Sequence, residues 1–312
     1  MRNLHEGRWG AFVGGELLLH AVTEGGAGES LYGNFPGATA ILRSDHNATG
    51  RSAVDELIGV IGGSGFYEFF DDPRTVTPDT PYGAPSGPIT IGEVAGREVA
   101  FLPRHGVHHE YPPHKVNHRA NLWALRSVGV RQVFAPCAVG SLRPTLGPGT
   151  VVIPDQLVDR TSGRPQTFFD TGGVHVEFAD PYCPALRRAA LQPGTEDGGV
   201  MVVVEGPRFS TRAESQWFAA QGWSLVNMTG HPEAVLAREL EVCYAAIALV
   251  TDLDAGIDAG SGVRAVDVFA EFARNIGPLK DLVRVAIAAA PTERDCACAQ
   301  VHDGVQLPIT LP

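Results

Sequence analysis

The sequence predicts an α/β protein, because strand-like and helix-like segments alternate from Leu57 to about Ala290. The strand-like segments are apolar runs typical of buried strands, and each stops at a cluster of glycine and polar residues. No internal repeat and no linker-like stretch interrupts residues 57–290, so we expect one domain there. Hydrophobic residues make up 44% of the chain, which is enough to bury the core of such a domain.

The elements follow in order from periodicity and from glycine and proline signals. The run LIGVIGG predicts the first strand, and two β-rich runs around residues 94–96 predict a hairpin. A helix is expected at 117–129, where Leu122, Leu125 and Val128 recur at helical spacing before Gly129. Further strands are expected at 130–140, 149–159, 200–207, 224–230 and 242–254, and further helices at 183–191, 211–221, 232–240 and 263–290, the last as one or two helices.

The ends of the chain differ from this domain in composition. Residues 1–55 are rich in Gly, Asn and Ser and show no sustained period. We therefore expect a poorly ordered N-terminal extension at 1–55, the folded domain at 56–290, and a C-terminal tail at 291–312.

The charge and hydropathy of the chain exclude several classes of partner. A formal net charge of -11 argues against nucleic acid and against an anionic membrane surface, and it leaves room only for a pocket-sized anion. No apolar run reaches the roughly 18 residues of a membrane-spanning helix. The first residues also lack a convincing secretory cleavage site, so we expect a cytoplasmic protein.

The cysteines suggest reduced thiols rather than a disulfide framework, since their number is odd and most lie in apolar segments. They are Cys137, Cys183, Cys243, Cys296 and Cys298. The C-x-C pair at 296–298 would allow a metal, but it lacks the second pair of a typical zinc site. This favours ordinary tail thiols and no metal.

The glycine turn IGGSG at 61–65 does not match either of the common phosphate loops. A dinucleotide fingerprint needs a third glycine where Glu68 stands, and a Walker loop needs a lysine, which is absent nearby. Two interpretations remain. The backbone N–H groups and the Ser64 hydroxyl cradle one phosphate, or the segment is an ordinary strand-to-loop turn.

Arg104 and His105 follow another predicted strand and favour the anion. A guanidinium offers a bidentate fork and an imidazole a further donor, so two cationic donors at one strand end indicate an anion site. Four more histidines lie nearby, at positions 108, 109, 114 and 118. Their only close carboxylate is Glu110 and their spacing is not that of metal ligands, so no metal is expected there.

Seven ordered motifs together give the chain a family resemblance. They are IGVIGGSGFYE, PYGAPS, LPRHGVHHEYPPHKVNHRANLWAL, VGSLRPTLGPGTVVIPDQLVDRTSGRPQTFFD, EGPRFSTRAES, NMTGHPEAVLARE and TDLDAG. The chain resembles the 5′-methylthioadenosine phosphorylases, in the trimeric branch of the purine nucleoside phosphorylase family, from about Leu57 to Ala290, with an echo in LPITLP at the end. The resemblance implies a single-domain nucleoside phosphorylase-like fold, with a mixed central β-sheet flanked by helices.

The resemblance also implies a reaction in which inorganic phosphate attacks C1′ of a 5′-modified adenosine and releases adenine and a ribose 1-phosphate derivative. Phosphate is then a co-substrate, and no cofactor is implied. The implied phosphate ligands are Ser64, Arg104, His105, Cys137, Ala138 and Thr229. Cys137 stands where the family usually has threonine, and a thiol is a poorer donor than a hydroxyl, so either phosphate binding is weakened or the Ala138 N–H suffices.

For the base, the resemblance implies that Asp252 acts as general acid at purine N7, which requires burial to raise its pKa. Asp254 would accept from the exocyclic amine, and Ser210 stands where 6-oxopurine relatives carry glutamate, so both positions favour adenine. Phe209 would stack on the base and Met228 would line the ribose, although such residues also pack ordinary cores.

Around the 5′ substituent, the resemblance implies Val266, Phe269 and Ala270, together with His175 from a neighbouring subunit of a homotrimer. Phe269 is bulkier and Ala270 smaller than is usual, so methylthio or another small apolar group is expected. Three rival functions stay open: a phosphorylase of 6-oxopurines such as inosine or methylthioinosine, a nucleosidase that uses water, and a non-catalytic purine nucleoside-binding protein.

Overall fold

The computed structural model describes residues 56–63, 65, 66, 70, 73–258 and 262–312, together with strands β1 (Gly10–Val13) and β2 (Glu16–Leu19). It divides into two compact units, Met1–Gly50 and Arg51–Pro312. In the first unit β1 and β2 pair antiparallel, a pair that the sequence did not predict. The expected disorder of residues 1–55 otherwise concerns positions outside the described residues, and the proposed boundaries at 56 and 290 stay predictions.

The second unit is built on a mixed sheet, which has eleven strands in the described part of the chain. Its main path runs β10-β8-β13-β7-β3-β6-β5-β4, and β12, β11 and β9 continue from the far part of β7. The strands are β3 (Leu57–Gly62), β4 (Arg74–Val76), β5 (Ile89–Val94), β6 (Arg97–Pro103), β7 (Val130–Ser141), β8 (Val151–Ile153), β9 (Gln156–Arg160), β10 (Thr195–Asp197), β11 (Val200–Val204), β12 (Leu225–Asn227) and β13 (Cys243–Leu253).

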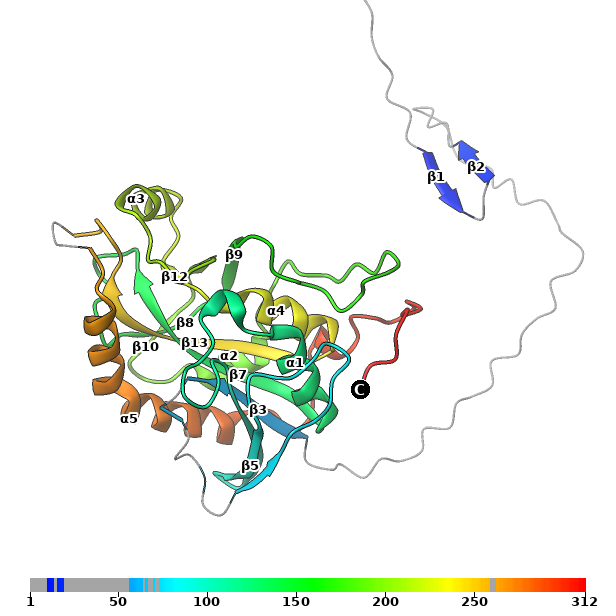
Figure 1. The fold of residues 1–312 in the computed structure, drawn as a ribbon, viewed down its shortest axis with the longest axis horizontal. Helices are drawn as coiled ribbons and strands as arrows, with labels where there is room; N and C mark the ends of the chain where they lie inside the picture. Colours follow the sequence, from blue (N-terminus) through cyan, green and yellow to red (C-terminus); the bar gives the residue numbers. More distant parts are fainter. Residues whose placement is uncertain are drawn as a thin grey trace, which may run out of the picture. The chain divides into compact units, whose positions relative to one another are not determined.

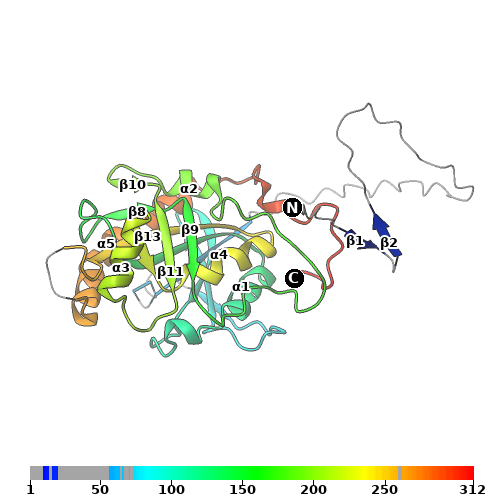
Figure 2. The same ribbon diagram turned by 90° about the horizontal axis from the view of Figure 1, so that it is seen from above.

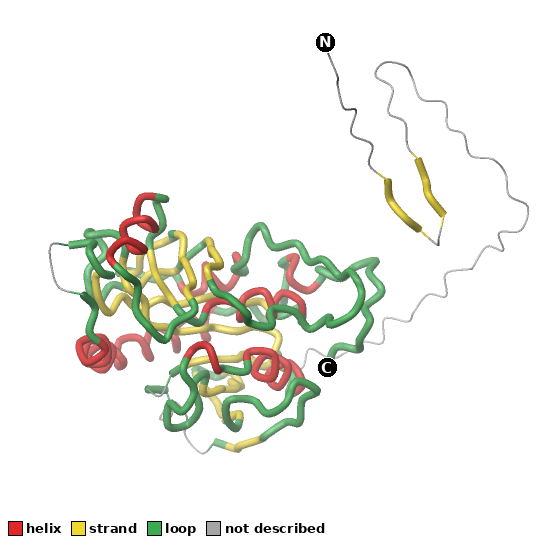
Figure 3. Tube along the Cα trace, turned by 45° about the horizontal axis from the view of Figure 1, so that its top comes forward, coloured by secondary structure: helices red, strands yellow, loops and turns green. Residues whose placement is uncertain are grey.

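Helices cover both faces of this sheet (Figure 1), so the predicted α/β fold with a flanked mixed sheet is confirmed. Residues of α1 and α4 join one buried apolar cluster, and residues of α2 and α5 join a second one across the sheet. Figure 3 shows the strands enclosed between the helices. The helices are η1 (Pro113–Lys115), α1 (His118–Ser127), α2 (Pro184–Ala190), α3 (Arg212–Ala220), α4 (Gly230–Glu239), α5 (Ala265–Ala289) and η2 (Ala297–Ala299).

Local signals explain where several elements begin and end. Ala95 and Gly96 both have positive φ, as a two-residue hairpin turn requires, and they join β5 to β6 as predicted. Thr211 and Glu214 form a capping box at the start of α3. The segment 263–290 forms one helix, α5, although Pro278 lies inside it. Strands β4 and β10 are short and were not predicted.

The central strand β7 is paired on one edge along most of its length and only in part on the other. On one edge it runs parallel to β13, from Gln132 to Ser141. On the other edge β3 pairs with β7 up to Phe134 and β12 pairs with it from Gly140, so among the described strands none pairs with residues 135–139 on that edge. Pro136 lies in this gap. Proline has no N–H to donate, and here no neighbouring strand requires one.

The C-terminal tail packs against the same unit. The Nε2 atom of buried His302 lies 2.7 Å from the Glu239 carbonyl, and Ile309 and Leu311 pack against the first apolar cluster. In the view of Figure 2, the end of the chain lies beside the helical layer that contains α1 and α4. No helix in the described residues has the length and apolar character needed to cross a membrane.

Candidate active site

A cavity of about 450 Å³ lies where the strands β3, β6, β11, β12 and β13 end, beside the unpaired part of β7. This volume is within the usual range of small-molecule sites, about 300–1,000 Å³. Arg104 and Asp252 both line it. We call the part around Arg104, Pro136, Cys137 and Thr229 the Arg104 end, and the part around Gly140, Asp252 and Asp254 the Asp252 end. The polar residues at the ends of these strands are thus brought to one cavity, which is where α/β folds commonly bind ligands.

The unpaired edge of β7 contributes backbone groups to this cavity. The Pro136 carbonyl accepts from Arg104 Nη1 at 3.1 Å, and the Ala138 carbonyl accepts from Asn227 Nδ2 at 3.1 Å. Within a strand, the N–H and C=O of one residue point to the same edge. The Ala138 N–H therefore lies on the open edge, where Ala138 lines the cavity.

Arg104 is 2% exposed, and its guanidinium is held from several sides. Nε and Nη2 donate to the two carboxylate oxygens of Glu233, at 2.6 and 3.0 Å, and Nη2 also donates to the Ile61 carbonyl. With the Pro136 bond, this leaves one N–H of Nη1 for a ligand. The bidentate fork that the sequence suggested for an anion is thus occupied by Glu233.

Glu233 itself is fully buried beneath the Arg104 end. Its Oε2 accepts from the Tyr244 hydroxyl at 2.9 Å, and its Oε1 lies 3.5 Å from His118 Nδ1. Burial opposes ionisation of this carboxyl, but the charge and hydrogen bonds of Arg104, with a smaller contribution from the nearby His118, outweigh it and lower its pKa to about 2. Glu233 therefore remains a carboxylate that holds Arg104 in place.

His105 lines the cavity next to Arg104, but it is not a second cation. Its Nδ1 lies 2.9 Å from the Tyr111 carbonyl, which can only accept, so Nδ1 carries the proton and Nε2 is left as an acceptor. Burial and the neighbouring Arg104 charge lower the pKa of His105 to about 4. The structure thus differs from the expectation of two cationic donors. His109, which the motifs did not single out, stacks on the His105 ring and also lines the cavity.

Thr229 lines the Arg104 end from the start of α4, and Asn227 holds it there. The Asn227 Oδ1 accepts from the backbone N–H groups of Thr229 and Gly230, at 2.8 and 2.6 Å. Because Asn227 Nδ2 donates to the Ala138 carbonyl, this one side chain links the open edge of β7 to the turn that carries Thr229. Cys137 also lines this end, and burial raises the pKa of its thiol to about 12, so it stays protonated.

At the Asp252 end, burial raises the pKa of Asp252 to about 6, and the nearby charge of Asp254 adds to this effect. The Thr251 hydroxyl donates to Asp252 Oδ2 at 2.8 Å and partly offsets it. A carboxyl with this pKa exchanges its proton close to neutral pH, as a general acid must.

Asp254 is 3% exposed and is fixed by Ser215 of α3, whose hydroxyl donates to Asp254 Oδ2 at 2.7 Å. Gly140 lies between the two aspartates. A Cβ atom there would lie 3.2 Å from Asp252 Oδ1 and 3.3 Å from Asp254 Cβ, so any side chain at this position would press on both residues.

Phe209, Ser210 and Met228 also line the cavity, as the resemblance implied for base and ribose. The buried Ser210 hydroxyl has no hydrogen-bond partner in the described structure, so it is available to a ligand. Gly206 has a φ of 65°, and a Cβ on it would lie 2.6 Å from Met228 Sδ, so the turn before Phe209 requires glycine.

The first turns of α5 line the remaining wall of the cavity, but with a different face from the one expected. Phe269 lines it as predicted, whereas Val266 and Ala270 are exposed and lie outside the lining. Their places are taken by Ala265, Val268 and Phe272. The face of a helix follows from its start and rotation, which motif matching does not determine.

Two other expected residues are not brought to this cavity by the described structure. His175 is exposed on the segment between β9 and α2 and does not line it. Its expected role is on a neighbouring subunit, so that role stays a prediction. Ser64 falls outside the described residues, although its neighbour Gly63 lines the cavity.

Sequence reasoning missed four residues that hold the site together, namely Glu233, Asn227, Ser215 and Gly140. All four lie inside motifs that were recognised: Asn227 and Glu233 in NMTGHPEAVLARE, Ser215 in EGPRFSTRAES, and Gly140 in the motif that begins VGSLRP. The signal that could have found Glu233 is a glutamate in an otherwise apolar segment, because a carboxylate there needs a cationic partner such as Arg104. Gly140 lies inside β7, and a glycine within a strand is a common mark of close approach to a ligand or neighbour.

Comparisons with known proteins show the family to which the chain belongs. The model of the phosphorylase superfamily matches residues 57–279. An S-methyl-5′-thioadenosine phosphorylase of Mycolicibacterium smegmatis is 70% identical over 258 residues, covering 82% of this chain and 100% of the relative. A purine nucleoside phosphorylase of Streptomyces coelicolor is 59% identical over 276 residues, covering 83% and 99%.

A solved structure of a methylthioadenosine phosphorylase from Schistosoma mansoni, in complex with adenine, has a TM-score of 0.72 and 34% identity, covering 77% of this chain and 93% of that one. The family model covers most of the chain, and the chain matches relatives over their full length at high identity, so the family is established. The chain belongs to the phosphorylase superfamily.

Proposed function

We propose that this protein is an S-methyl-5′-thioadenosine phosphorylase. An oxygen of inorganic phosphate forms a bond to C1′ of the ribose while the bond from C1′ to N9 of adenine breaks. The electron pair of that bond passes to the purine, which takes a proton from Asp252 at N7. The products are adenine and 5-methylthioribose 1-phosphate, and Asp252 is reprotonated from solvent. The reaction needs phosphate as co-substrate and no cofactor.

One observation carries the proposal: Arg104 and Asp252 line the same cavity beside different parts of β7. Arg104 bonds to the Pro136 carbonyl, and Asp252 lies beside Gly140, four residues further along the strand. A nucleophile held near Arg104 and a proton donor at Asp252 flank a single nucleoside. Stabilising the departing base and holding the nucleophile are both needed in the transition state of N-glycosidic cleavage.

Phosphate is assigned to the Arg104 end. The donors there are the remaining N–H of Arg104 and the Ala138 N–H. The Thr229 hydroxyl, which donates to Asn227 Oδ1 at 3.3 Å, becomes a third donor when it rotates toward the phosphate, and Ser64 is proposed as a further ligand from the motif alone. The Nε2 atom of neutral His105 accepts from the hydroxyl of a monoprotonated phosphate. Cys137 contributes a weak donor at most, so the Ala138 N–H takes the place of the family's threonine hydroxyl.

Adenine is assigned to the Asp252 end. Asp252 is the general acid at N7, and Asp254, oriented by Ser215, accepts from the 6-amino group. A carboxylate accepts from an amino group and repels a 6-oxo group, so this pair selects adenine. Phe209 stacks on the base, Ser210 offers its free hydroxyl, and Met228 packs against the ribose.

The 5′ substituent is assigned to the wall formed by α5, where Val268, Phe269 and Phe272 present apolar surface that suits a methylthio group. We also propose a homotrimer in which His175 of a neighbouring subunit closes this end. Analytical ultracentrifugation tests it, because a monomer in solution would contradict that arrangement.

The central experiment is a panel of 5′-substituted adenosines assayed with and without phosphate, with adenine release as the readout. We expect release from S-methyl-5′-thioadenosine to require phosphate and to exceed release from adenosine. Unchanged release without phosphate would identify a nucleosidase instead, and binding without turnover would identify a non-catalytic binding protein.

A second candidate is phosphorolysis of 6-oxopurine nucleosides, which the name of the Streptomyces coelicolor relative supports. The same panel extended to inosine and methylthioinosine separates the two. If hypoxanthine is released faster than adenine, the assignment of Asp254 to the 6-amino group is wrong.

A further inference from the structure

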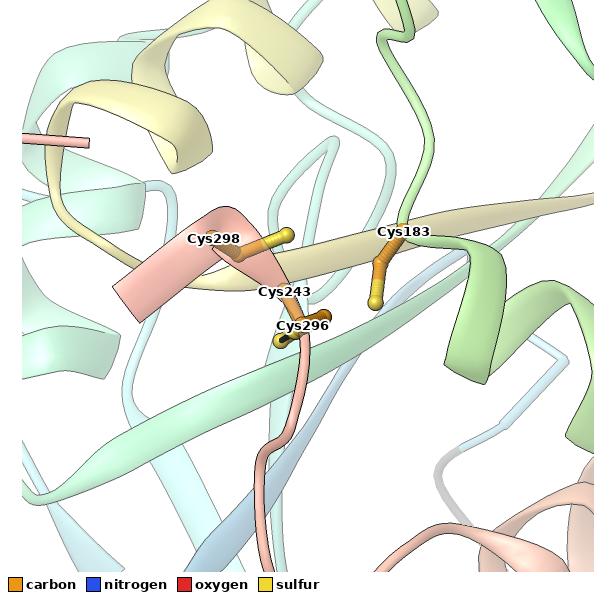
Figure 4. Close-up of side chains that lie close together, drawn as sticks. All are labelled: Cys183, Cys243, Cys296 and Cys298. Atoms are coloured by element: carbon orange, nitrogen blue, oxygen red, sulfur yellow. Dashed lines mark hydrogen bonds between the residues drawn. The ribbon is translucent and has the colours of Figure 1, made fainter. Parts of the chain in front are cut away.

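Four of the five cysteines converge at one place, remote from the cavity. One Sγ atom each of Cys183, Cys243, Cys296 and Cys298 lies within 4.8 Å of the other three. Figure 4 shows the four side chains meeting where the C-terminal segment crosses the beginning of β13. The fold thus supplies the second pair that the C-x-C motif lacks in the sequence.

The four cysteines come from three distant segments of the chain. Cys183 precedes α2, and its backbone N–H donates to the Tyr244 carbonyl at 2.8 Å, next to Cys243 at the start of β13. Cys296 and Cys298 lie at the start of η2 and inside it. Whatever joins the four sulfurs therefore fastens the C-terminal segment to the sheet and to α2.

The spacing of the sulfur atoms fits a metal ion. Tetrahedral zinc with Zn–S bonds of about 2.3 Å places its sulfur ligands about 3.8 Å apart. Cys243 Sγ and Cys296 Sγ are 3.3 Å apart, and the whole set lies within 4.8 Å. A disulfide needs about 2.05 Å. The four sulfurs thus surround one point rather than forming two pairs.

Candidate outer donors lie close to three of the four sulfurs. The backbone N–H of Leu186 is near the Cys183 thiol, the N–H of Cys298 is near the Cys296 thiol, and the Arg294 side chain is near the Cys243 thiol. The positive charge of Arg294 offsets part of the negative charge of four thiolates.

We propose that Cys183, Cys243, Cys296 and Cys298 bind one zinc ion as a structural site. Four thiolates are ligands that zinc prefers, and a closed set of four protein ligands leaves no position for substrate. Cys183, Cys243 and Cys298 are at most 3% exposed, which also excludes water from the ion.

This site is independent of the proposed reaction. Cys243 begins β13 and Asp252 lies near its end, so about 30 Å of extended strand separates them. Loss of the metal should therefore affect the attachment of the C-terminal segment and the stability of the fold far more than the chemistry.

The test is the metal content of the full chain, produced with zinc in the medium and purified without chelator. Elemental analysis by mass spectrometry is expected to find about one zinc ion per chain. The double variant Cys296→Ser/Cys298→Ser should lose it. Ala297→Ser adds a hydroxyl between the same two positions but keeps every thiol, and Cys137→Ser removes the one cysteine outside the cluster, so both should retain the zinc.

Thermal unfolding supplies a second readout. A strong chelator should lower the Tm of the wild type and leave the Tm of the double variant, already lower, unchanged. If the double variant does not fold, the zinc content of the wild type and the effect of chelator on it still decide the question.

Three outcomes overturn the proposal. One is wild-type protein without zinc and with five thiols open to alkylation after denaturation. Another is wild-type protein whose intact mass is lower than that of the fully reduced chain by two hydrogens for each disulfide, which would show that the cysteines are oxidised. The third is zinc that remains bound in the double variant, which would place it elsewhere.

Discussion

The two ends of the cavity hold buried carboxylates in opposite ways. At the Arg104 end, Glu233 is paired with a guanidinium and a tyrosine hydroxyl, and its pKa is held at about 2. At the Asp252 end, the nearest charge is another carboxylate, and the pKa of Asp252 rises to about 6. One end therefore keeps its charge fixed and serves to position a nucleophile, while the other keeps a proton that can be transferred.

The largest effect is expected from Asp252→Asn. The amide still donates a hydrogen bond to N7 but transfers no proton, so kcat should fall by about 10²–10⁴-fold while KM changes little. Steady-state kinetics with S-methyl-5′-thioadenosine measures this. Asp281→Asn, the same change at an exposed position on α5, is the control. Equal losses in kcat and in substrate affinity would count against the role of general acid.

Glu233→Gln should destabilise the Arg104 end of the cavity, because it leaves Arg104 as a buried charge without its partner. Disrupting such a pair costs about 3–5 kcal/mol of unfolding free energy. Urea unfolding measures this, with Glu98→Gln as the control, because Glu98 forms an exposed pair with Arg74 that contributes about 0–1 kcal/mol. If the two variants lose similar amounts of stability, the buried pair of Arg104 and Glu233 is no more important to the fold than the exposed pair of Arg74 and Glu98.

The two ends should also respond to pH with opposite signs. The pKa of Asp252 is raised from 3.8 to about 6, so its stabilising contribution is present at low pH and is lost as the pH rises through about 6. The pKa of Glu233 is lowered from 4.5 to about 2, so its contribution is present above pH 4.5 and is lost as the pH falls toward 2.

The pKa of His105 is lowered to about 4, so its contribution to stability rises between pH 4 and 6 while that of Asp252 falls. The pH dependence of wild-type stability alone therefore does not separate the two residues. The difference in unfolding free energy between Asp252→Asn and the wild type isolates the contribution of Asp252. Chemical denaturation from pH 4 to 7 should show the variant gaining relative stability as the pH rises, by at most about 3 kcal/mol. A flat difference would mean that Asp252 titrates normally.

The smallest effect is expected from Ser215→Ala, which removes the hydroxyl that orients Asp254. Loss of about 1 kcal/mol should lower kcat/KM for the adenine nucleoside by about fivefold and reduce its preference over the 6-oxopurine analogue. Ser127→Ala, which also removes one side-chain hydrogen bond but in α1, is the control. An unchanged preference would show that Asp254 needs no such support.

Much of the fold and part of the site follow from the sequence, since strand ends, turns and caps are local signals. The regular part of α4 begins at Pro232 as predicted, because His231 is extended. The pairing of Arg104 with Glu233 joins residues 129 positions apart, and the cysteine cluster spans residues 183–298. Such contacts depend on the order of strands in the sheet, which no local pattern encodes. The shifted face of α5 has a different cause, because it follows from where the helix starts and how it is rotated.

The gap on one edge of β7 has a consequence for how ligand binding could be observed. Where strands pair, ladder bonds slow the exchange of backbone amide hydrogens with solvent, and the described strands provide no such partner for Ala138 on that edge. A bound oxyanion that accepts from this amide takes the place of the missing partner. Deuterium uptake at Ala138 should therefore fall as the ligand concentration rises, which makes this single amide a direct measure of occupancy in the absence of turnover.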